Sequence, residues 1–298
     1  MSSGTSPLGP YEPYRQPEVI MPRADGGPPP VYPRPGRPRP KVWLHVLLFA
    51  LTVASTWLFI GWQYSLCVMT ILTFHEFGHF FAARYYRVPA TLPYFIPFPS
   101  LFGTMGAVIR MSPFIPNRRA LFDIAAAGPI AGLVVAIPVT LYGVATSEII
   151  PSMAEAPEGS FQLGDSLLFK AMQWLFHGSQ GADATLMLNN VAYAGWVGLF
   201  VTALNLLPIS QLDGGHISYA LFREKSRMVA MLAFGALIVT TLLLGFHYVL
   251  IILLMAYAGI RHPPTMDDSR ELDRTRWWLG IGLGIVFLLC FTPVPVEL

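Results

Sequence analysis

The hydrophobic pattern of the chain predicts a protein that crosses a membrane several times. From residue 42 onward, apolar stretches of about 20 residues alternate with short polar segments, and this is the length that a helix needs to span the hydrocarbon core of a bilayer. Another apolar run, residues 228–260, is too long for one ordinary span and short for two. The clear single spans are residues 43–63, 65–86, 120–146, 186–207 and 277–292.

The distribution of positive charge indicates how residues 228–260 fold. If this run forms a helical hairpin that turns near His247, every lysine and arginine except Lys170 falls on one side of the membrane. Lysine and arginine are enriched in cytoplasmic segments of membrane proteins. The sequence therefore predicts about seven spans, with the N-terminus in the cytoplasm and the C-terminus outside.

Two segments outside the spans have their own character. Residues 1–41 are rich in proline and glycine and have no apolar run, which predicts a disordered cytoplasmic tail or, alternatively, a docking segment for proline-recognising modules. Residues 42–298 form the predicted integral-membrane domain, with its core at 65–224. The outside loop 148–184 contains the segment 166–178, which is either an amphipathic interfacial helix or a plain connection.

Residues 88–113 do not fit a simple span because they contain prolines at positions 89, 93, 97, 99 and 113. The glycines of "GTMG" at 103–106 favour a turn between two extended segments. A β-hairpin that dips into the membrane requires protein or a wet cavity to satisfy its backbone, and a cytoplasmic loop is the alternative. The predicted fold class is an all-α polytopic membrane protein with about seven transmembrane segments and a re-entrant β-hairpin.

Composition agrees with this picture and excludes several classes of protein. The chain has 298 residues, 54% of them hydrophobic and only 12% charged, whereas soluble domains are about a quarter charged. The net charge of +2, without a long basic run, gives no electrostatic footprint for nucleic acid. Cys67 and Cys290 lie in apolar stretches, which excludes a disulfide framework and a thiolate zinc site.

The second span contains polar residues that point to metal chemistry. His75, Glu76 and His79 form the pattern His-Glu-x-x-His in the middle of an apolar helix. The two histidines lie one turn apart on the same helix face, so both imidazoles can reach one zinc ion, and Glu76 beside them can take a proton from a water. Ionisable groups within a span are costly and are functional candidates by default.

A catalytic zinc ion usually has three protein ligands, so a third is expected from another span. Asp213 is the better candidate because Pro208 and Gly214–Gly215 are predicted to break the helix there and to leave the acid facing a cavity. Asp123, near a basic pair at the start of the third span, fits an interfacial ion pair or a helix start.

Two further polar residues lie near the predicted break. Asn205 can donate an amide hydrogen bond to a substrate carbonyl or its oxyanion, or form an interhelical hydrogen bond instead. His216 is a possible fourth group at the metal, although a role at the cytoplasmic face without metal is favoured.

These motifs resemble the site-2 protease family of intramembrane zinc metalloproteases. "HEFGH" within a span and "NLLPISQLDG" far downstream carry the resemblance, and "FGTMGAVIRM", "NRRALFDIAAAGPIAG" and "RHPPTMDD" are similar to the bacterial and chloroplast-type subgroup without a PDZ domain. The resemblance covers roughly residues 43–292. The sequence departs from the family in its proline-rich tail and in having no PDZ or CBS module, so the resemblance implies no particular manner of regulation.

The resemblance implies a function and a set of site residues. It implies one catalytic Zn²⁺ held by His75, His79 and Asp213, with Glu76 activating the water and Asn205 assisting near the scissile carbonyl. Residues 92–111 would be the re-entrant hairpin that receives the substrate. The expected activity is cleavage of single-span membrane proteins in regulated intramembrane proteolysis, in the bacterial inner membrane and near its cytoplasmic side. A zinc transporter that uses the same cluster is the alternative, and the oligomeric state and the identity of the substrate are not predicted.

Overall fold

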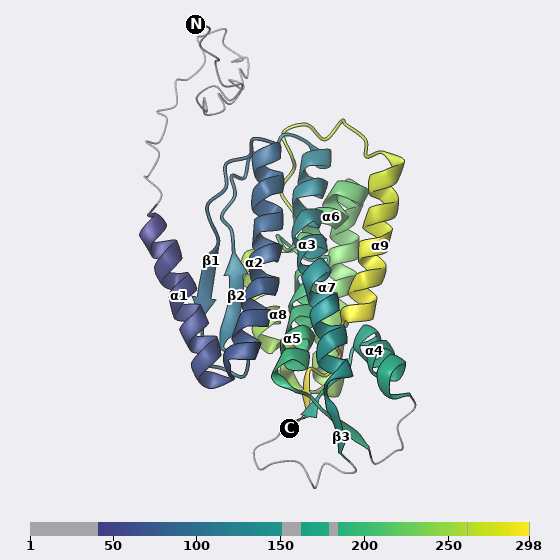
Figure 1. The fold of residues 1–298 in the computed structure, drawn as a ribbon. Helices are drawn as coiled ribbons and strands as arrows, with labels where there is room; N and C mark the ends of the chain where they lie inside the picture. Colours follow the sequence, from purple (N-terminus) through teal and green to yellow (C-terminus); the bar gives the residue numbers. More distant parts are fainter. Residues whose placement is uncertain (1–40, 151–161, 179–183, 261, 298) are drawn as a thin grey trace, which may run out of the picture. The chain divides into compact units, whose positions relative to one another are not determined.

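The structure is a computed structural model that describes residues 41–150, 162–178, 184–260 and 262–297. Residues 41–298 form one compact unit. The predicted disordered tail lies outside the described residues and stays a prediction. Helices dominate the fold, and short two-stranded sheets lie beside and below the bundle in Figure 1.

The described chain contains nine α-helices, two 3₁₀ turns and six short strands. The helices are α1 Val42–Phe59, α2 Trp62–Tyr85, α3 Arg118–Ala145, α4 Leu167–His177, α5 Asn190–Asn205, α6 Asp213–Phe222, α7 Ser226–Leu244, α8 Val249–Ala258 and α9 Arg274–Cys290, with 3₁₀ turns at Arg223–Lys225 and Phe246–Tyr248. The strands are β1 Tyr94–Pro97, β2 Thr104–Val108, β3 Glu148–Ile150, β4 Gln162–Leu163, β5 Thr185–Met187 and β6 Val296–Glu297.

Helix α3 lies at the centre of the bundle and packs against α2, α5 and α6 (Figure 1). It begins at a cap in which the side chain of Asn117 accepts a hydrogen bond from the N–H of Ala120, at 3.0 Å. Small residues bring the neighbouring helices close: a Cβ atom on Gly78 of α2 would lie 2.4 Å from the carbonyl oxygen of Ala127. This close packing lets polar groups of different helices meet inside the bundle.

The outward faces of the bundle are apolar, as expected for a protein surrounded by lipid. Large hydrophobic side chains such as Leu58, Leu243 and Leu250 are exposed on α1, α7 and α8. Among the described residues, four helical segments are long and apolar enough to cross a membrane: Val42–Phe59, Trp62–Tyr85, Arg118–Ala145 and Asp213–Leu244, the last of which joins α6 and α7. The other apolar helices, α5, α8 and α9, have 16, 10 and 17 residues.

The long apolar run 228–260 is divided into two helices, as predicted. Helix α7 ends at Leu244, and Gly245 follows with a φ of 111°, a conformation that glycine adopts without steric cost. A single 3₁₀ turn that contains His247 then leads into α8. The predicted break near His247 is therefore confirmed.

Residues 88–113 form the predicted β-hairpin, but its turn lies earlier than "GTMG". β1 and β2 pair antiparallel with Phe95 opposite Ala107, and the chain reverses between Phe98 and Gly103. Gly103 closes this turn with a φ of 66°, whereas Thr104 already belongs to β2. Gly106, with a φ of 92°, lies within β2 opposite an irregularity in the pairing. The turn predicted at 103–106 was therefore wrong in position. A glycine with positive φ can close a turn, as Gly103 does, but it can also lie at an irregularity within a strand, as Gly106 does.

The break before Asp213 has a different cause from the one predicted. Helix α5 ends at Asn205 and α6 begins at Asp213, so Pro208 lies within the break as expected. Gly214 and Gly215, however, are helical residues of α6. A Cβ atom on Gly214 would lie 1.9 Å from the carbonyl oxygen of Leu206. The glycines therefore do not break the helix but let the preceding loop fold back against its first turn.

The loop between α3 and α5 contains the helix that the sequence left open. Helix α4 covers most of the segment 166–178, and the Ser166 side chain caps it by accepting a hydrogen bond from Phe169 N–H. Phe169 and Met172 are buried, whereas Trp174 and Leu175 are exposed. The helix is thus confirmed, and its placement at a membrane interface stays a prediction.

Candidate metal centre

The His-Glu-x-x-His pattern lies in the second half of α2, which faces the interior of the bundle. His75, Glu76 and His79 are 3%, 5% and 5% exposed, so all three polar side chains are buried. Burial of three such groups in an apolar bundle is costly unless they bind one another or a metal ion. Helix α3 covers them from one side, and the start of α6 contributes the group that completes the cluster.

His75, His79 and Asp213 converge on one point from α2 and α6. The Oδ2 atom of Asp213 lies 3.3 Å from Nε2 of His75 and 3.2 Å from Nε2 of His79, and the two Nε2 atoms are 3.2 Å apart. These residues form the one group of three or more candidate ligands, with all donor atoms within 4.8 Å, that is found in the described part of the chain. The structure thus brings together the two histidines and the aspartate that the sequence singled out.

The dimensions of this triangle fit a zinc ion. Ligand atoms at about 2.05 Å from a tetrahedral zinc ion are separated by about 3.3 Å, close to each of the three observed distances. Two imidazole nitrogens and one carboxylate oxygen are also the donor types that zinc prefers in catalytic sites. A zinc ion held by these three residues would have one position left for a water or a substrate.

A backbone carbonyl orients His79 for metal binding. Nδ1 of His79 donates a hydrogen bond to the carbonyl oxygen of Ile124 on α3, at 2.8 Å. This bond places the proton on Nδ1 and directs the lone pair of Nε2 into the triangle, as in metal-binding histidines generally. This contact could not be predicted from the sequence, because the acceptor is a main-chain atom of an apolar residue.

Two glycines of α3 make room for the imidazoles. A Cβ atom on Gly128 would lie 2.0 Å from Nε2 of His79, and one on Gly132 would lie 3.1 Å from Nδ1 of His75. Both residues belong to the segment "GPIAG", whose spacing of four residues places the glycines on one helix face. The spacing of the two glycines could have indicated a closely packed helix face, but the sequence does not show that this face packs against the two histidines.

We expect Gly128→Ala to lower zinc affinity strongly, because the new methyl group would displace the His79 ring from the triangle. Loss of one ligand typically weakens a zinc site by more than the 10- to 100-fold effect of removing an orienting partner. Zinc content after dialysis against a weak chelator measures the effect. Gly235→Ala is the matched control, since its Cβ atom meets no atom within 4 Å; full zinc retention by Gly128→Ala would contradict this packing argument.

Glu76 and Asn205 lie beside the triangle rather than in it. Nδ2 of Asn205, the last residue of α5, is 3.1 Å from Nε2 of His75. The backbone N–H of Ile109, just after β2, lies near the Glu76 carboxylate and favours its charged form. The N–H of the next residue, Arg110, instead donates to Thr91 on the β1 side, so Ile109 presents its N–H to the opposite edge. One edge of the hairpin therefore reaches the glutamate.

Asp123 takes the structural role that the sequence favoured, with a different partner. Its carboxylate pairs with the guanidinium of Arg276 on α9, at 2.6 and 2.8 Å, and accepts a hydrogen bond from the hydroxyl of Tyr86. The predicted ion pair is confirmed, but the cap of α3 is Asn117 and not Asp123. The neighbouring Arg118 instead donates hydrogen bonds to backbone carbonyls.

His216 contacts a segment that follows α8. Its Nδ1 atom lies 2.5 Å from Nε2 of His262, and the His262 ring stacks on Tyr219. Tyr219 and Thr265 both donate hydrogen bonds to the carboxylate of Asp268. Burial opposes the charged form of that carboxylate, but these hydrogen bonds outweigh it and lower the pKa of Asp268. His216 is not part of the triangle of candidate ligands.

Comparison with known proteins gives a family match over the region that contains the site. Residues 63–246 match the family described as Peptidase family M50, and this range includes every residue of the triangle. The match therefore covers α2 through α7, together with the β-hairpin.

Several plant proteins are similar to this chain. It is 34% identical over 243 residues to "Probable zinc metalloprotease EGY1, chloroplastic" of Oryza sativa subsp. japonica, covering 77% of this chain and 40% of that protein. It is 34% identical over 247 residues to the Arabidopsis thaliana protein of the same name, covering 78% and 42%. "Probable zinc metallopeptidase EGY3, chloroplastic" of Arabidopsis thaliana is 28% identical over 221 residues, covering 64% and 36%. The chain thus spans less than half the length of these relatives.

Proposed function

Because this chain belongs to Peptidase family M50, we propose that it is a membrane-embedded zinc endopeptidase. The observation that carries the proposal is the buried triangle of His75, His79 and Asp213, whose dimensions suit a zinc ion, with a glutamate beside it. The names of the similar plant proteins, which include "zinc metalloprotease", support the same chemistry.

Each residue of the site has a role in hydrolysis of a peptide bond. His75, His79 and Asp213 would hold the zinc ion, which when bound supplies Lewis acidity toward a water and toward the scissile carbonyl. Glu76 takes the proton of the attacking water and delivers it to the leaving nitrogen. Asn205, whose amide lies beside His75, would donate a hydrogen bond to the substrate carbonyl oxygen as negative charge develops there.

The hairpin supports a way of presenting the scissile bond. A transmembrane helix hides its peptide bonds in its own hydrogen bonds, so the substrate must unwind locally before cleavage. Among the described strands β2 pairs only with β1, and its other edge leads to the Ile109 N–H beside Glu76. An unwound substrate pairing with this edge would bring its backbone to the catalytic glutamate. In this proposal the hairpin is re-entrant and lies within the membrane.

The topology and substrate complete the proposal. The proposed seven spans correspond to α1, α2, α3, α5, α7, α8 and α9, although the 10 residues of α8 are short for a complete crossing. The bias of Lys and Arg supports a cytoplasmic N-terminus and a site near the cytoplasmic side. The substrates are single-span membrane proteins cut in regulated intramembrane proteolysis. A bacterial inner membrane is the proposed location, although the similar plant proteins carry chloroplastic names.

Reconstitution of the purified chain into vesicles tests the proposed function. We expect zinc-dependent cleavage of a model single-span peptide and no net zinc flux into the vesicles. Removal of zinc with a chelator should abolish cleavage, and readdition should restore it. Zinc flux without cleavage would instead support the transporter alternative, for which a chain of polar sites across the membrane is required.

A further inference from the structure

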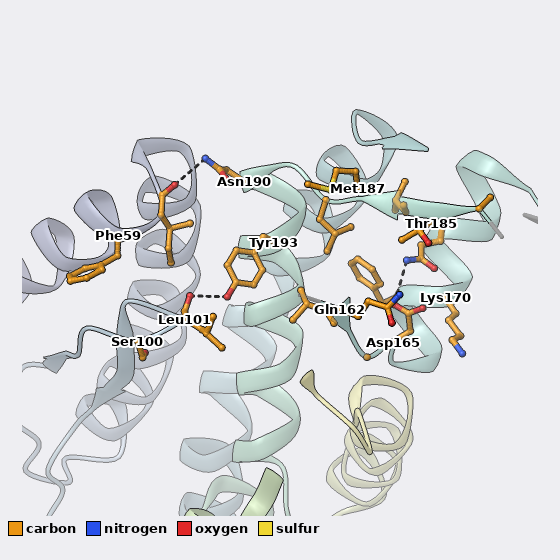
Figure 2. A pocket seen from close by; sticks show the side chains of 18 residues that line it. Phe59, Ser100, Leu101, Gln162, Asp165, Lys170, Thr185, Met187, Asn190 and Tyr193 are labelled. Carbon is orange, nitrogen blue, oxygen red and sulfur yellow. Dashed lines mark hydrogen bonds between the residues drawn. The ribbon is translucent and has the colours of Figure 1, made fainter. Parts of the chain in front are cut away.

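A large cavity lies at the end of the bundle where α1 ends and α2 begins (Figure 2). Its volume is about 800 Å³, within the range of ligand-binding pockets. His75 follows Trp62, the first residue of α2, by thirteen positions, so the metal centre is about 20 Å away along the helix. We call this cavity the distal pocket; its walls are the hairpin turn at Ser100 and Leu101, residues 162–165, residues 184–188, and parts of α4 and α5.

Two walls of the distal pocket are edges of strands. Residues 162–165 and 184–188 line it without interruption, and these ranges contain β4 and β5. Since side chains alternate between the two faces of a strand, a cavity that contacts successive residues meets the strand at its edge. In the described part of the chain β4 pairs only with β6 and β5 only with β3, so each strand has one edge without a strand partner. An extended peptide can add to such an edge.

Hydrogen bonds to α5 hold the walls in place. The indole N–H of Trp196 donates to the carbonyl oxygen of Gly164, at 2.8 Å, and the hydroxyl of Tyr193 donates to that of Leu101, also at 2.8 Å. The second of these contacts is drawn in Figure 2. The hydroxyl of Tyr64 on α2 donates a hydrogen bond to the carbonyl oxygen of Phe102, which lies in the same hairpin turn. A pocket fixed in this way requires little ordering when a ligand binds.

The hairpin connects the distal pocket with the catalytic glutamate. Its turn lines the pocket at Leu101, and β2 runs from this turn toward Ile109, whose N–H lies near Glu76. Ile109 follows Leu101 by eight positions, and the extended part from Thr104 to Ile109 covers about 17 Å. A substrate that pairs with the edge of β2 therefore continues, in its extended form, into the distal pocket.

We propose that the distal pocket binds the extended segment that flanks the membrane-spanning part of the substrate, which rests on the proposed function as an endopeptidase. The lining favours a peptide with mixed side chains, because Asp165 and Lys170 stand beside the apolar Phe169 and Leu186. The bound segment begins about eight residues from the scissile bond, as the length of β2 and its turn requires. The pocket thus selects substrates by a sequence outside the membrane.

Two substrate peptides that differ in their flanking segment, and two variants that fill the distal pocket, test this proposal. One single-span peptide carries a ten-residue flank of alternating valine and threonine on the pocket side, and a second carries a glycine–serine flank of equal length, which has low strand propensity. The variants Gln162→Trp and Lys170→Trp fill the pocket from two exposed positions. Glu148→Trp is the matched control, exposed on the neighbouring β3 but outside the pocket lining.

We expect the wild-type chain to cleave the valine–threonine substrate with a KM about tenfold lower than that of the glycine–serine substrate, which corresponds to about 1.4 kcal/mol. Both pocket variants should abolish this difference without changing kcat or zinc content, and Glu148→Trp should retain it. Equal KM values for the two substrates in the wild-type chain would overturn the proposal, as would an unchanged difference in both pocket variants.

A binding measurement separates failure of the pocket from failure of the proposed function. The valine–threonine flank alone, carrying a photo-crosslinker, should label residues 162–165 or 184–188 of the wild-type chain, and less so after Gln162→Trp. Labelling without any cleavage of the full substrates would contradict the endopeptidase function but not the peptide site. Cleavage without labelling, and with no preference between flanks, would overturn the distal pocket as a substrate site.

Discussion

Glu76→Gln is expected to abolish peptide cleavage while the protein retains its zinc. Glutamine has the same shape as glutamate and fits the buried position, but its amide cannot take a proton from the attacking water. General bases contribute rate factors of 10² to 10⁴, so we expect kcat to fall by about 10³. Single-turnover cleavage of a model single-span peptide, with zinc measured on the same sample, checks both parts of this expectation.

A matched variant distinguishes this effect from a general loss of charge. Glu148→Gln makes the same chemical change at an exposed residue of β3 and should leave kcat and zinc content unchanged. Robust cleavage by Glu76→Gln would show that another group acts as the base. Loss of zinc together with activity would show instead that Glu76 is needed to form the metal site.

The candidate site could be predicted from the sequence because charge is costly within a membrane. In a chain with few charged residues, a glutamate and an aspartate inside apolar spans stand out, and His75 and His79 share one helix face by their spacing alone. Pro208 marked the break that lets Asp213 approach from a second segment. These signals are local in sequence, which is why a single sequence was sufficient to find them.

Other contacts between distant segments could not be predicted in this way. Arg276, which pairs with Asp123, lies 153 residues further along the chain, whereas the sequence drew attention to the adjacent basic pair. The carbonyl of Ile124 and the N–H of Ile109 are backbone groups that any residue carries. Their importance follows from the packing of α2 against α3 and the hairpin.

Glycines were misread for a related reason. The sequence shows that a glycine is present but not whether it supplies a positive φ or removes a side chain. Gly103 closes a turn, whereas Gly106 sits at an irregularity within a strand. Gly214 is in an ordinary helix and is needed because a loop carbonyl lies where its Cβ would be. Three physical roles therefore share one residue type, and the fold decides among them.

Asp213→Ala is expected to remove zinc from the protein almost completely. The carboxylate is the one oxygen ligand of the triangle, and without it His75 and His79 offer two nitrogens where a catalytic zinc site has three protein ligands. The carbonyl of Ile124 still holds the His79 ring and the Asn205 amide still contacts His75, so the loss falls on metal affinity rather than on the fold. Zinc bound per protein after equilibration with a competing chelator measures it.

Asp123→Asn separates ligand loss from the loss of any intramembrane acid. Asp123 is also a carboxylate within an apolar helix, but it pairs with Arg276 and lies outside the triangle. Its replacement should lower thermal stability, because the partly buried Arg276 guanidinium keeps only Asp273 as a charged partner, and should leave zinc content at the wild-type level. Zinc loss in Asp123→Asn but not in Asp213→Ala would reverse the assignment of the third ligand. The two variants thus test whether an acid binds zinc because it lies beside His75 and His79, and not simply because it lies within the membrane.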